Sequence, residues 1–217
     1  MRFAIALVPL AVVSACKVKE PLPIASAWYD GFERADLGPN YEATGSGYRV
    51  AAGQVSAKGA KNHPLWLRKR LPRNVRIEFD AWSTEPRGDI KVEVFGDGAS
   101  YDGDGGAYTA TGYEVIFGGW GNSKSIIARL DEHGKDLAQR VDVKVIPHRH
   151  YHWKIERQGT KLTWWIDPTV PRPDGQPALP FLELVDPQPL EGAGHEYFAL
   201  NNWETDTWFD NLVITPL

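Results

Sequence analysis

The chain has 217 residues, 42% of them hydrophobic, and a formal net charge of −4. That length and composition suit one large β domain with a substantial core. We do not expect nucleic-acid binding, because it would need a clustered basic surface. Abundant Trp, Tyr, Phe, Gly and Pro favour short strands and turns over helices, so an all-β fold is predicted.

The first 15 residues have the pattern of a signal peptide: Arg2, an apolar stretch over 3–13, then two small residues before Cys16. Residues 13–16, Val-Ser-Ala-Cys, resemble the lipobox of bacterial lipoproteins, which implies a lipidated Cys16 as the mature N-terminus. The alternative is an ordinary signal peptide followed by a chance cysteine.

Residues 16–27 lack hydrophobic periodicity and are interpreted as a lipidated tether. The resemblance implies an exported protein that contacts the membrane through the Cys16 lipid alone. Lys17, in place of Asp, implies the outer membrane if the host has one. A single cysteine allows no disulfide within the chain, so stability must come from the core.

From residue 28 onward, strand patterns recur between turn residues, as expected of a β-sandwich. After an opening strand and turn within 28–41, the predicted strands are 48–57, 65–71, 76–83, 89–95, 112–120, 126–130, 140–146, 151–157, 161–167, 181–185, 196–203 and 207–217. Proline-rich residues 168–180 predict a loop. Trp153 and Trp164 share apolar strand faces with neighbouring aliphatic residues and are assigned to the core.

The beginning and end of this domain resemble a known superfamily. Phe32, residues 34–38 and Tyr41 resemble the opening strand and turn of concanavalin A-like jelly rolls of the laminin-G type, and residues 207–217 resemble their closing strand. The resemblance covers 28–217. It implies a two-sheet antiparallel β-sandwich, or jelly roll, in which the first strand lies beside the last.

Residues 76–83 and 89–95 are predicted to pair as a hairpin. Alternation places Ile77 and Phe79 on one face of the first strand, and Glu78, Asp80 and Trp82 on the other. The second strand likewise separates residues Ile90, Val92 and Val94 from Lys91, Glu93 and Phe95. One face is expected to build the core and the other to carry the functional residues.

The spacing Glu78-x-Asp80-x-Trp82 resembles the Glu-x-Asp-x-Glu strand of jelly-roll glucanases, with Trp where the third carboxylate belongs. On adjacent strands, Glu93 or Glu114 could supply the missing group, since opposed side chains have Cβ atoms about 5.5 Å apart or less. A retaining glycosidase needs carboxyl groups about 5 to 5.5 Å apart. The alternative is a solvated polar face. The substituted Trp favours recognition over catalysis.

Sugar binding needs aromatic planes for pyranose C–H faces, with amides and charged groups for the hydroxyls. The candidate ligand-binding residues are Trp82, Lys91, Glu93, Trp120, Asn201, Asn202 and Trp203. In a regular strand only one of the two asparagines can face a sugar, and Asn201 is preferred. For each tryptophan taken alone, core packing is the alternative.

Two acidic pairs could hold a structural Ca²⁺, which prefers several oxygen ligands. Asp102 and Asp104 lie in a glycine-rich loop, for which a flexible rim is the alternative. Asp30 and Asp210 are brought together only by the resemblance, and it implies that a structural ion is common in the superfamily. Two carboxylates are few for a Ca²⁺ cage.

Three functions follow as hypotheses. The first is an exported, lipid-anchored protein that binds a polysaccharide or another glycan through its concave sheet. The second is a glycoside hydrolase acting on a polysaccharide through Glu78, Asp80, Glu93 or Glu114. The third is a non-catalytic cell-envelope interaction module, in which Trp82 and Trp120 are packed beneath loops.

Overall fold

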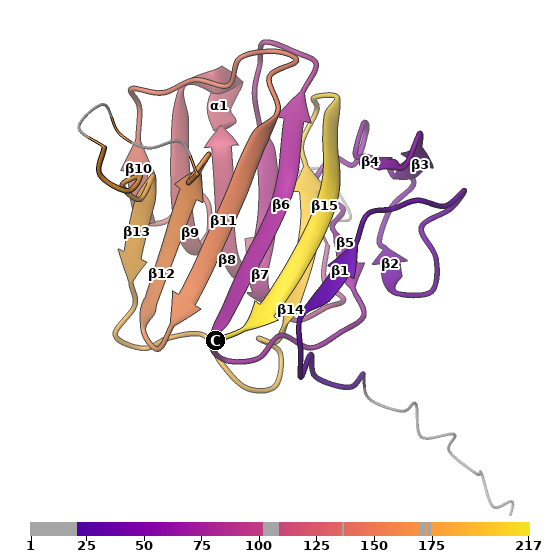
Figure 1. The fold of residues 1–217 in the computed structure, drawn as a ribbon, viewed down its shortest axis with the longest axis horizontal. Helices are drawn as coiled ribbons and strands as arrows, with labels where there is room; N and C mark the ends of the chain where they lie inside the picture. Colours follow the sequence, from indigo (N-terminus) through magenta and orange to yellow (C-terminus); the bar gives the residue numbers. More distant parts are fainter. Residues whose placement is uncertain (1–20, 102–108, 136, 170–171, 173–174) are drawn as a thin grey trace, which may run out of the picture.

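The computed structural model describes residues 21–101, 109–135, 137–169, 172 and 175–217. Almost all of its regular structure is β (Figure 1). The elements in chain order are β1 (Trp28–Asp30), β2 (Tyr41–Ala43), β3 (Arg49–Ala51), β4 (Gln54–Ser56), β5 (Leu65–Leu67), β6 (Val75–Ser83), β7 (Ile90–Gly96), β8 (Thr109–Gly118), α1 (Gly119–Asn122), β9 (Lys124–Asp131), β10 (Leu137–Arg140), β11 (Tyr151–Gln158), β12 (Lys161–Ile166), β13 (Leu182–Val185), β14 (Tyr197–Asn202) and β15 (Thr207–Pro216).

The strands form two stacked antiparallel sheets. An eight-stranded sheet has the order β13-β12-β11-β6-β15-β4-β3, with β1 paired to β15. A seven-stranded sheet has the order β10-β9-β8-β7-β14-β5-β2. Figure 1 shows the first sheet in front of the second. The predicted all-β sandwich is therefore confirmed, and so is the pairing of the first strand with the last.

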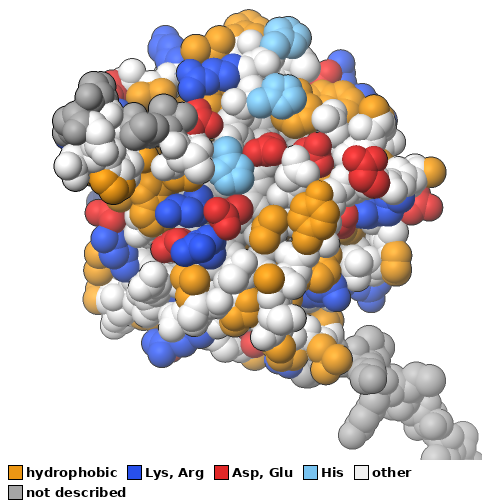
Figure 2. Space-filling view, viewed as in Figure 1, with side chains coloured by type: hydrophobic (Ala, Val, Ile, Leu, Met, Phe, Trp, Pro, Cys, Tyr) orange, Lys and Arg blue, Asp and Glu red, His pale blue; other side chains and the backbone are white. Residues whose placement is uncertain are grey.

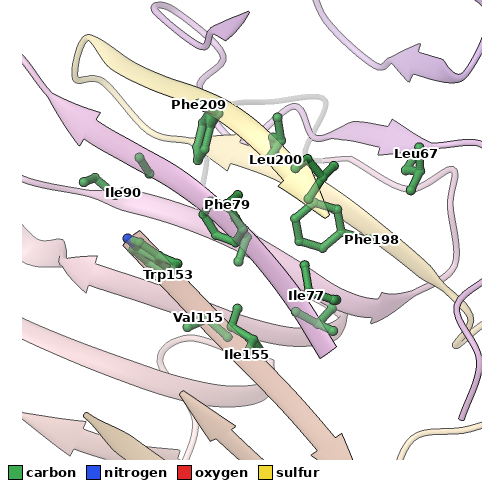
Figure 3. Close-up of a cluster of buried hydrophobic side chains, with 14 of the residues drawn as sticks. Leu67, Ile77, Phe79, Ile90, Val115, Trp153, Ile155, Phe198, Leu200 and Phe209 are labelled. Carbon is green, nitrogen blue, oxygen red and sulfur yellow. The ribbon is translucent and has the colours of Figure 1, made fainter. Parts of the chain in front are cut away.

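The core lies between the two sheets and is formed by the inward positions of alternating strands (Figure 3). Phe79 on β6 lies at its centre: its ring is 5.2 Å from Trp153 in the same sheet and 6.0 Å from Phe198 in the other. Trp153 and Trp164 are fully buried, as predicted. Each large apolar side chain buried in this way contributes about 1.5–3 kcal/mol.

The predicted hairpin of residues 76–83 and 89–95 is wrong. β6 pairs with β11 and β15, whereas β7 pairs with β8 and β14 in the other sheet. The connection between β6 and β7 is therefore a corner that crosses from one sheet to the other. Alternation determines which side chains of a strand point inward, but it is the same for a hairpin and for a corner.

Gly88 makes this corner possible. Its φ is +72°, and a Cβ there would lie 2.4 Å from the carbonyl oxygen of Gly118 at the end of β8. The same carbonyl accepts a hydrogen bond from the backbone N–H of Asp89 at 2.9 Å. The corner is thereby held against the seven-stranded sheet, which positions Asp89 beside the outer face of that sheet.

The strand predicted at 140–146 is also wrong. β10 ends at Arg140, whose guanidinium binds the carboxylate of Asp142 two residues later, at 2.6 and 2.9 Å. The backbone N–H and C=O of Val145 bond the side chain of Asn122 and not a neighbouring strand. Among the described residues no helix is long and apolar enough to cross a membrane. The proposed signal peptide and Cys16 lie outside the described residues.

Candidate functional site

A pocket of about 440 Å³ lies over the outer face of the seven-stranded sheet. Its walls come from the β6–β7 corner, α1, the turn after β9 and the connection between β14 and β15. Three residues predicted as ligand-binding line it together: Lys91, Trp120 and Trp203. The site is therefore built mainly from connections, with a strand residue as its floor.

A strained turn holds Trp120 at the pocket. Trp120, Gly121 and Asn122 all have left-handed φ angles, of 52°, 67° and 65°. For a bulky residue this conformation costs about 1–3 kcal/mol, so the surroundings must impose it. The side chain of Asn122 does so: it donates to the carbonyls of Pro86 and Val145 and accepts from the backbone N–H of Val145, at 2.8–2.9 Å.

Trp120 remains 37% exposed. The ammonium of Lys124 lies 3.7 Å from its ring centroid. The ring of His133 meets it edge-on at 5.6 Å. Residues in strained backbone conformations cluster at active sites and ligand-binding sites.

Lys91 forms the floor of the pocket and is only 2% exposed. Its ammonium donates to Glu132 at 2.7 Å and to Asn62 at 3.0 Å, and lies 3.7 Å from Glu114. Leu130, with φ of 64°, turns the chain near the end of β9, and the following residues bring Glu132 to Lys91. Burial alone would lower the pKa of Lys91, but the surrounding carboxylates raise it above its usual value.

Two carboxyl groups near this floor have raised pKa values. Burial raises the pKa of Glu114 well above its ordinary value, more than the nearby Lys91 lowers it. Neither carboxyl oxygen of Glu114 has a hydrogen-bond partner among the described residues. Burial also raises the pKa of Asp89, which lines the pocket. Both groups therefore favour the neutral acid more than a solvated carboxyl would.

Glu93 lies directly opposite Glu114 across β7 and β8, as expected for neighbouring strands. It is fully buried, and one carboxylate oxygen accepts hydrogen bonds from the backbone N–H groups of Thr111 and Gly112 at 2.8 and 2.7 Å. Glu93 thus fixes the first part of β8. Neither Glu93 nor Glu114 lines the pocket.

The other two predicted catalytic carboxylates lie on the opposite side of the sandwich, because β6 belongs to the eight-stranded sheet. Asp80 binds the Nδ1 atom of His152 at 2.8 Å and accepts from the amide of Asn211 at 2.9 Å. Glu78 lies 3.8 Å from the other ring nitrogen of His152. Figure 2 shows acidic and histidine side chains gathered on this face. The expectation that Glu78 and Asp80 share a face with Glu93 and Glu114 is wrong.

Trp82 is on that opposite side too, and its ring lies between two others. The ring of His150 stacks on it at 3.9 Å and 14°, and that of Trp208 is parallel to it at 6.2 Å and 8°. Only 7% of Trp82 is exposed. The ring of Trp82 packs against those of His150 and Trp208 and leaves no exposed face for a sugar. The prediction that Trp82 lies beside Trp120 and Trp203 is therefore wrong.

The two asparagines on β14 point to different faces, as predicted. Asn201 is the cross-strand partner of Lys91, is fully buried, and its Nδ2 lacks a hydrogen-bond partner among the described residues. Asn202 donates to the carbonyl of Ala57 at 3.1 Å and accepts from the hydroxyl of Thr205 at 3.0 Å. Asn202 therefore braces the connection that carries Trp203.

The expected metal ligands are engaged elsewhere or not described. Asp30 accepts from the guanidinium of Arg34 at 2.6 and 2.9 Å and from the hydroxyl of Tyr41 at 2.9 Å. Asp210 is the cross-strand partner of Asp80 on the eight-stranded sheet. Across the described ranges, no group of three or more His, Cys, Asp or Glu could hold a metal. Asp102 and Asp104 lie outside the described residues.

Sequence reasoning missed four charged pocket residues: Arg87, Asp89, Glu132 and Glu204. All four lie in connections, or at their edges, where no periodicity assigns a face. The available signal was local: charged residues gather between 85 and 89, just before the strand that carries Lys91. Arg87 and Glu204 form an exposed ion pair of 2.7 Å at the pocket.

Solved structures share this architecture. The CBM66 carbohydrate-binding module of Bacillus subtilis aligns with a TM-score of 0.56 at 11% identity, over 83% of this chain and 98% of the module. The fold is a jelly-roll β-sandwich. A β-1,3-1,4-glucanase (lichenase) from a mouse hindgut metagenome aligns with a TM-score of 0.56 at 9% identity, over 88% of this chain and all of the enzyme.

A structure from a study of the endo-acting O-glycanases with which human gut bacteria initiate mucin breakdown gives a TM-score of 0.55 at 12% identity, over 88% of this chain and 98% of that one. No family model matches the sequence, and no curated protein matches it. At these identities the likeness establishes the fold, and the function has to be argued from the pocket.

Proposed function

We propose that the protein binds glycans, and that the pocket floored by Lys91 is the binding site. The observation that carries the proposal is the convergence of Trp120 and Trp203 on one pocket whose floor offers both donors and acceptors. Indole planes suit the C–H faces of pyranose rings. Hydroxyl groups can accept from Arg87 and donate to Glu132, which both line the pocket, as polar groups in ligand pockets commonly do.

The size of the pocket limits the ligand. Ligand sites usually measure about 300–1,000 Å³, and 440 Å³ is near the small end of that range. A short segment or chain end of a polysaccharide suits it better than a long run of sugar units. The similar structures include a carbohydrate-binding module and a glucanase, which is consistent with this ligand class.

We further propose that the protein is exported and anchored through a lipid on Cys16, in the outer membrane where the host has one. The described tether supports a definite orientation. The backbone N–H of Ile24 donates to the carbonyl oxygen of Arg70, which precedes β6 in the chain. The pocket residues Arg87 and Asp89 follow the other end of β6. Nine residues of β6, whose two ends are seen in Figure 1, span about 30 Å. The pocket would therefore lie far from the membrane.

A glycoside hydrolase is the second candidate, and one observation favours it. Asp89 and Glu132 line the same pocket, and the raised pKa of Asp89 is a property that a general acid needs. The carboxylates that the sequence predicts as catalytic do not support it, because Glu93 and Glu114 are buried and Asp80 is bound to His152. An interaction module without a sugar site is less well supported, since Trp120 lines an open pocket.

A glycan array probed with the protein from residue 17 onward tests binding. Trp120→Ala and Trp203→Ala should lose the signal, while Trp165→Ala, on the outer face of the other sheet, should keep it. Absence of binding to every sugar would overturn the proposal. Reducing-sugar release from each positive glycan, compared between the wild type and Asp89→Asn, would then distinguish hydrolysis from recognition alone.

The anchor is tested separately in cells. Wild-type protein should partition with the membrane and label with a fatty-acid probe, and Cys16→Ser should do neither. Labelling of Cys16→Ser, or a wild type that remains unlabelled, would contradict lipidation of this cysteine.

A further inference from the structure

A second pocket, of about 360 Å³, lies at the other end of the sandwich from the candidate glycan site. Arg73, which precedes β6, and Phe95, near the end of β7, both line it. In the glycan pocket, by contrast, Arg87 follows β6 and Lys91 is near the start of β7. Both strands therefore run from one pocket to the other.

Arg157, near the end of β11, is the buried cation of this second pocket and is only 2% exposed. Its guanidinium donates to the carbonyls of Leu190 at 2.6 Å and Gly159 at 3.2 Å, and lies 4.2 Å from the ring centroid of Phe95. Its ion-pair partner among the described residues is Glu191, at 3.4 Å. Burial lowers the pKa of Arg157, more than the nearby acidic groups raise it. The protein thus compensates this buried charge incompletely.

Glu191 is shared between two arginines. One carboxylate oxygen, Oε2, accepts from Arg73 at 2.8 Å and from Arg157 at 3.4 Å. Glu191 is half-exposed, and Gly192 and Gly194 follow it with φ angles of 80° and 87° and open space where a Cβ would lie. Glycines in such a connection leave the backbone free to change conformation. The carboxylate can therefore move away from the arginines without disturbing a strand.

His195 adds a polar atom without a partner to the same pocket. Its Nδ1 atom is buried and has no hydrogen-bond partner among the described residues, although most buried polar atoms have one. The other carboxylate in the wall, Glu196, is bound to Arg70 at 3.5 Å. Two arginines and a ring nitrogen therefore converge where the only carboxylate available to them is Glu191 among the described lining residues.

We infer that this pocket binds a phosphate group, and that Glu191 holds the two arginines in its place when no phosphate is bound. A tetrahedral phosphate has enough oxygens to accept from Arg73, Arg157 and His195 together. Glu191 serves both arginines through one oxygen and leaves His195 without a partner. Planar guanidinium groups match phosphate oxygens particularly well. The inference goes beyond glycan binding and does not depend on it.

The position of the pocket favours a phosphate on a membrane headgroup. The backbone N–H of Leu71, in the pocket wall, donates to the carbonyl of Glu196 at 2.6 Å. The preceding residue, Arg70, accepts from the backbone N–H of Ile24 in the tether at 2.9 Å. The tether therefore leaves the domain beside this pocket, and the proposed lipid on Cys16 would bring the pocket to the bilayer. A soluble phosphate ester has the same chemistry, so the test separates the two sources.

Calorimetric titrations of the full-length protein with inorganic phosphate, glycerol phosphate and acetate test the inference. The two phosphates should bind at least about tenfold more tightly than acetate. Arg73→Gln should weaken phosphate binding about tenfold, because it removes one of the two guanidinium groups. Glu191→Gln should tighten it about threefold, because a neutral amide competes less well for the arginines. Both side chains are half-exposed or more, so both variants are expected to fold.

Two matched controls change the same charges at the other end of the sandwich. Arg149→Gln removes an exposed guanidinium just before β11, whereas Arg157 lies near the end of that strand. Glu85→Gln removes a carboxylate from the corner between β6 and β7. Both should leave the phosphate affinity unchanged, and thermal unfolding checks that every variant is folded.

Vesicles distinguish the two sources of phosphate. Flotation in the Cys16→Ser background, which removes any attached lipid, compares phosphatidylcholine vesicles that contain phosphatidic acid with vesicles given the same negative charge by oleate. For a headgroup, retention on phosphatidic acid should fall with Arg73→Gln and rise with Glu191→Gln, and retention on oleate should not change. Effects on soluble phosphates alone would support the phosphate site and assign it to a soluble ester.

Three results would overturn the inference and leave glycan binding standing. The first is acetate binding as tight as phosphate binding, or no phosphate binding at all. The second is phosphate binding that neither Arg73→Gln nor Glu191→Gln changes. The third is a loss with Arg149→Gln as large as that with Arg73→Gln, which would show that general surface charge attracts the phosphate.

Discussion

The ammonium of Lys91 donates to the carboxylate of Glu132 at 2.7 Å on the floor of the pocket, where Lys91 is almost completely buried. The pair links β7 to the turn after β9. It also keeps two charged groups together beneath the two tryptophans. Buried pairs of this kind contribute to stability mainly because each partner would be costly alone.

Lys91→Met should therefore destabilise the fold by about 3–5 kcal/mol, because Glu132 would lose its buried partner. Urea unfolding measures the change. The matched control is Lys161→Met, which removes a half-exposed lysine paired with Glu183 and should cost about 1 kcal/mol or less. The double variant Lys91→Met/Glu132→Gln should recover part of the loss. No recovery would mean that the pair is not coupled.

Trp120 should show opposite effects of substitution on binding and on stability. Trp120→Gly removes both the indole and the backbone strain, so it should abolish glycan binding while stabilising the fold by about 1 kcal/mol. Trp120→Ala removes the indole but keeps a Cβ in the left-handed conformation, so it should lose binding without that gain. Equal stability of the two variants would show that strain is not stored at this residue.

The corner at Gly88 should be sensitive to a single methyl group. Gly88→Ala combines a φ of +72° with a Cβ only 2.4 Å from the carbonyl oxygen of Gly118. Gly159→Ala has a similar φ of +60° but open space around it, so it should cost only about 1 kcal/mol. Chemical denaturation should show a clearly larger loss for Gly88→Ala. Similar losses would argue against the close approach of corner and sheet.

His152 should make stability depend on pH. Its hydrogen bond to Asp80, together with the charges of Asp80 and Glu78, raises the pKa of His152 despite partial burial. This contribution is fully present below the unfolded pKa of about 6.5 and is lost as pH rises through the higher folded value. His152→Gln should therefore flatten the decline in stability above pH 6.5. His148→Asn, which changes an exposed histidine three residues before β11, should leave the profile unchanged.

Asp80 gives the complementary signature at low pH. Its pKa is lowered, chiefly by the hydrogen bond with His152. A lowered carboxyl pKa stabilises the fold above the unfolded value of about 3.9, and that contribution is lost as pH falls through the folded value. The interaction between His152 and Asp80 therefore stabilises the fold between the two folded-state pKa values. Its contribution is lost above the pKa of His152 and below the pKa of Asp80.

Alternation along the strands was enough to predict much of the core. Phe79, Val92 and Val115 point inward as expected, because a one-residue shift would expose every apolar side chain of a strand. The sheet to which each strand belongs could not be read in the same way. The connection between β6 and β7 decides whether Glu78 and Glu93 share a face, and the strand pattern contains no information about it.

The pocket illustrates the same limit. Lys91 was assigned to the correct face because it lies within a regular strand, whereas Glu132 and Asp89 lie where the chain turns. Their positions depend on left-handed residues such as Leu130, whose conformation is imposed by tertiary contacts. Side chains in connections become part of a site only through packing that no local pattern specifies.

The most direct test of the account is an NMR titration of protein labelled with ¹⁵N at tryptophan, using a glycan that is positive on the array. The indole N–H resonances of Trp120 and Trp203 should shift on binding, while those of Trp165 and Trp208, on the eight-stranded sheet, should stay in place. Shifts confined to Trp165 and Trp208 would place the glycan on the opposite face and contradict the assignment of the pocket.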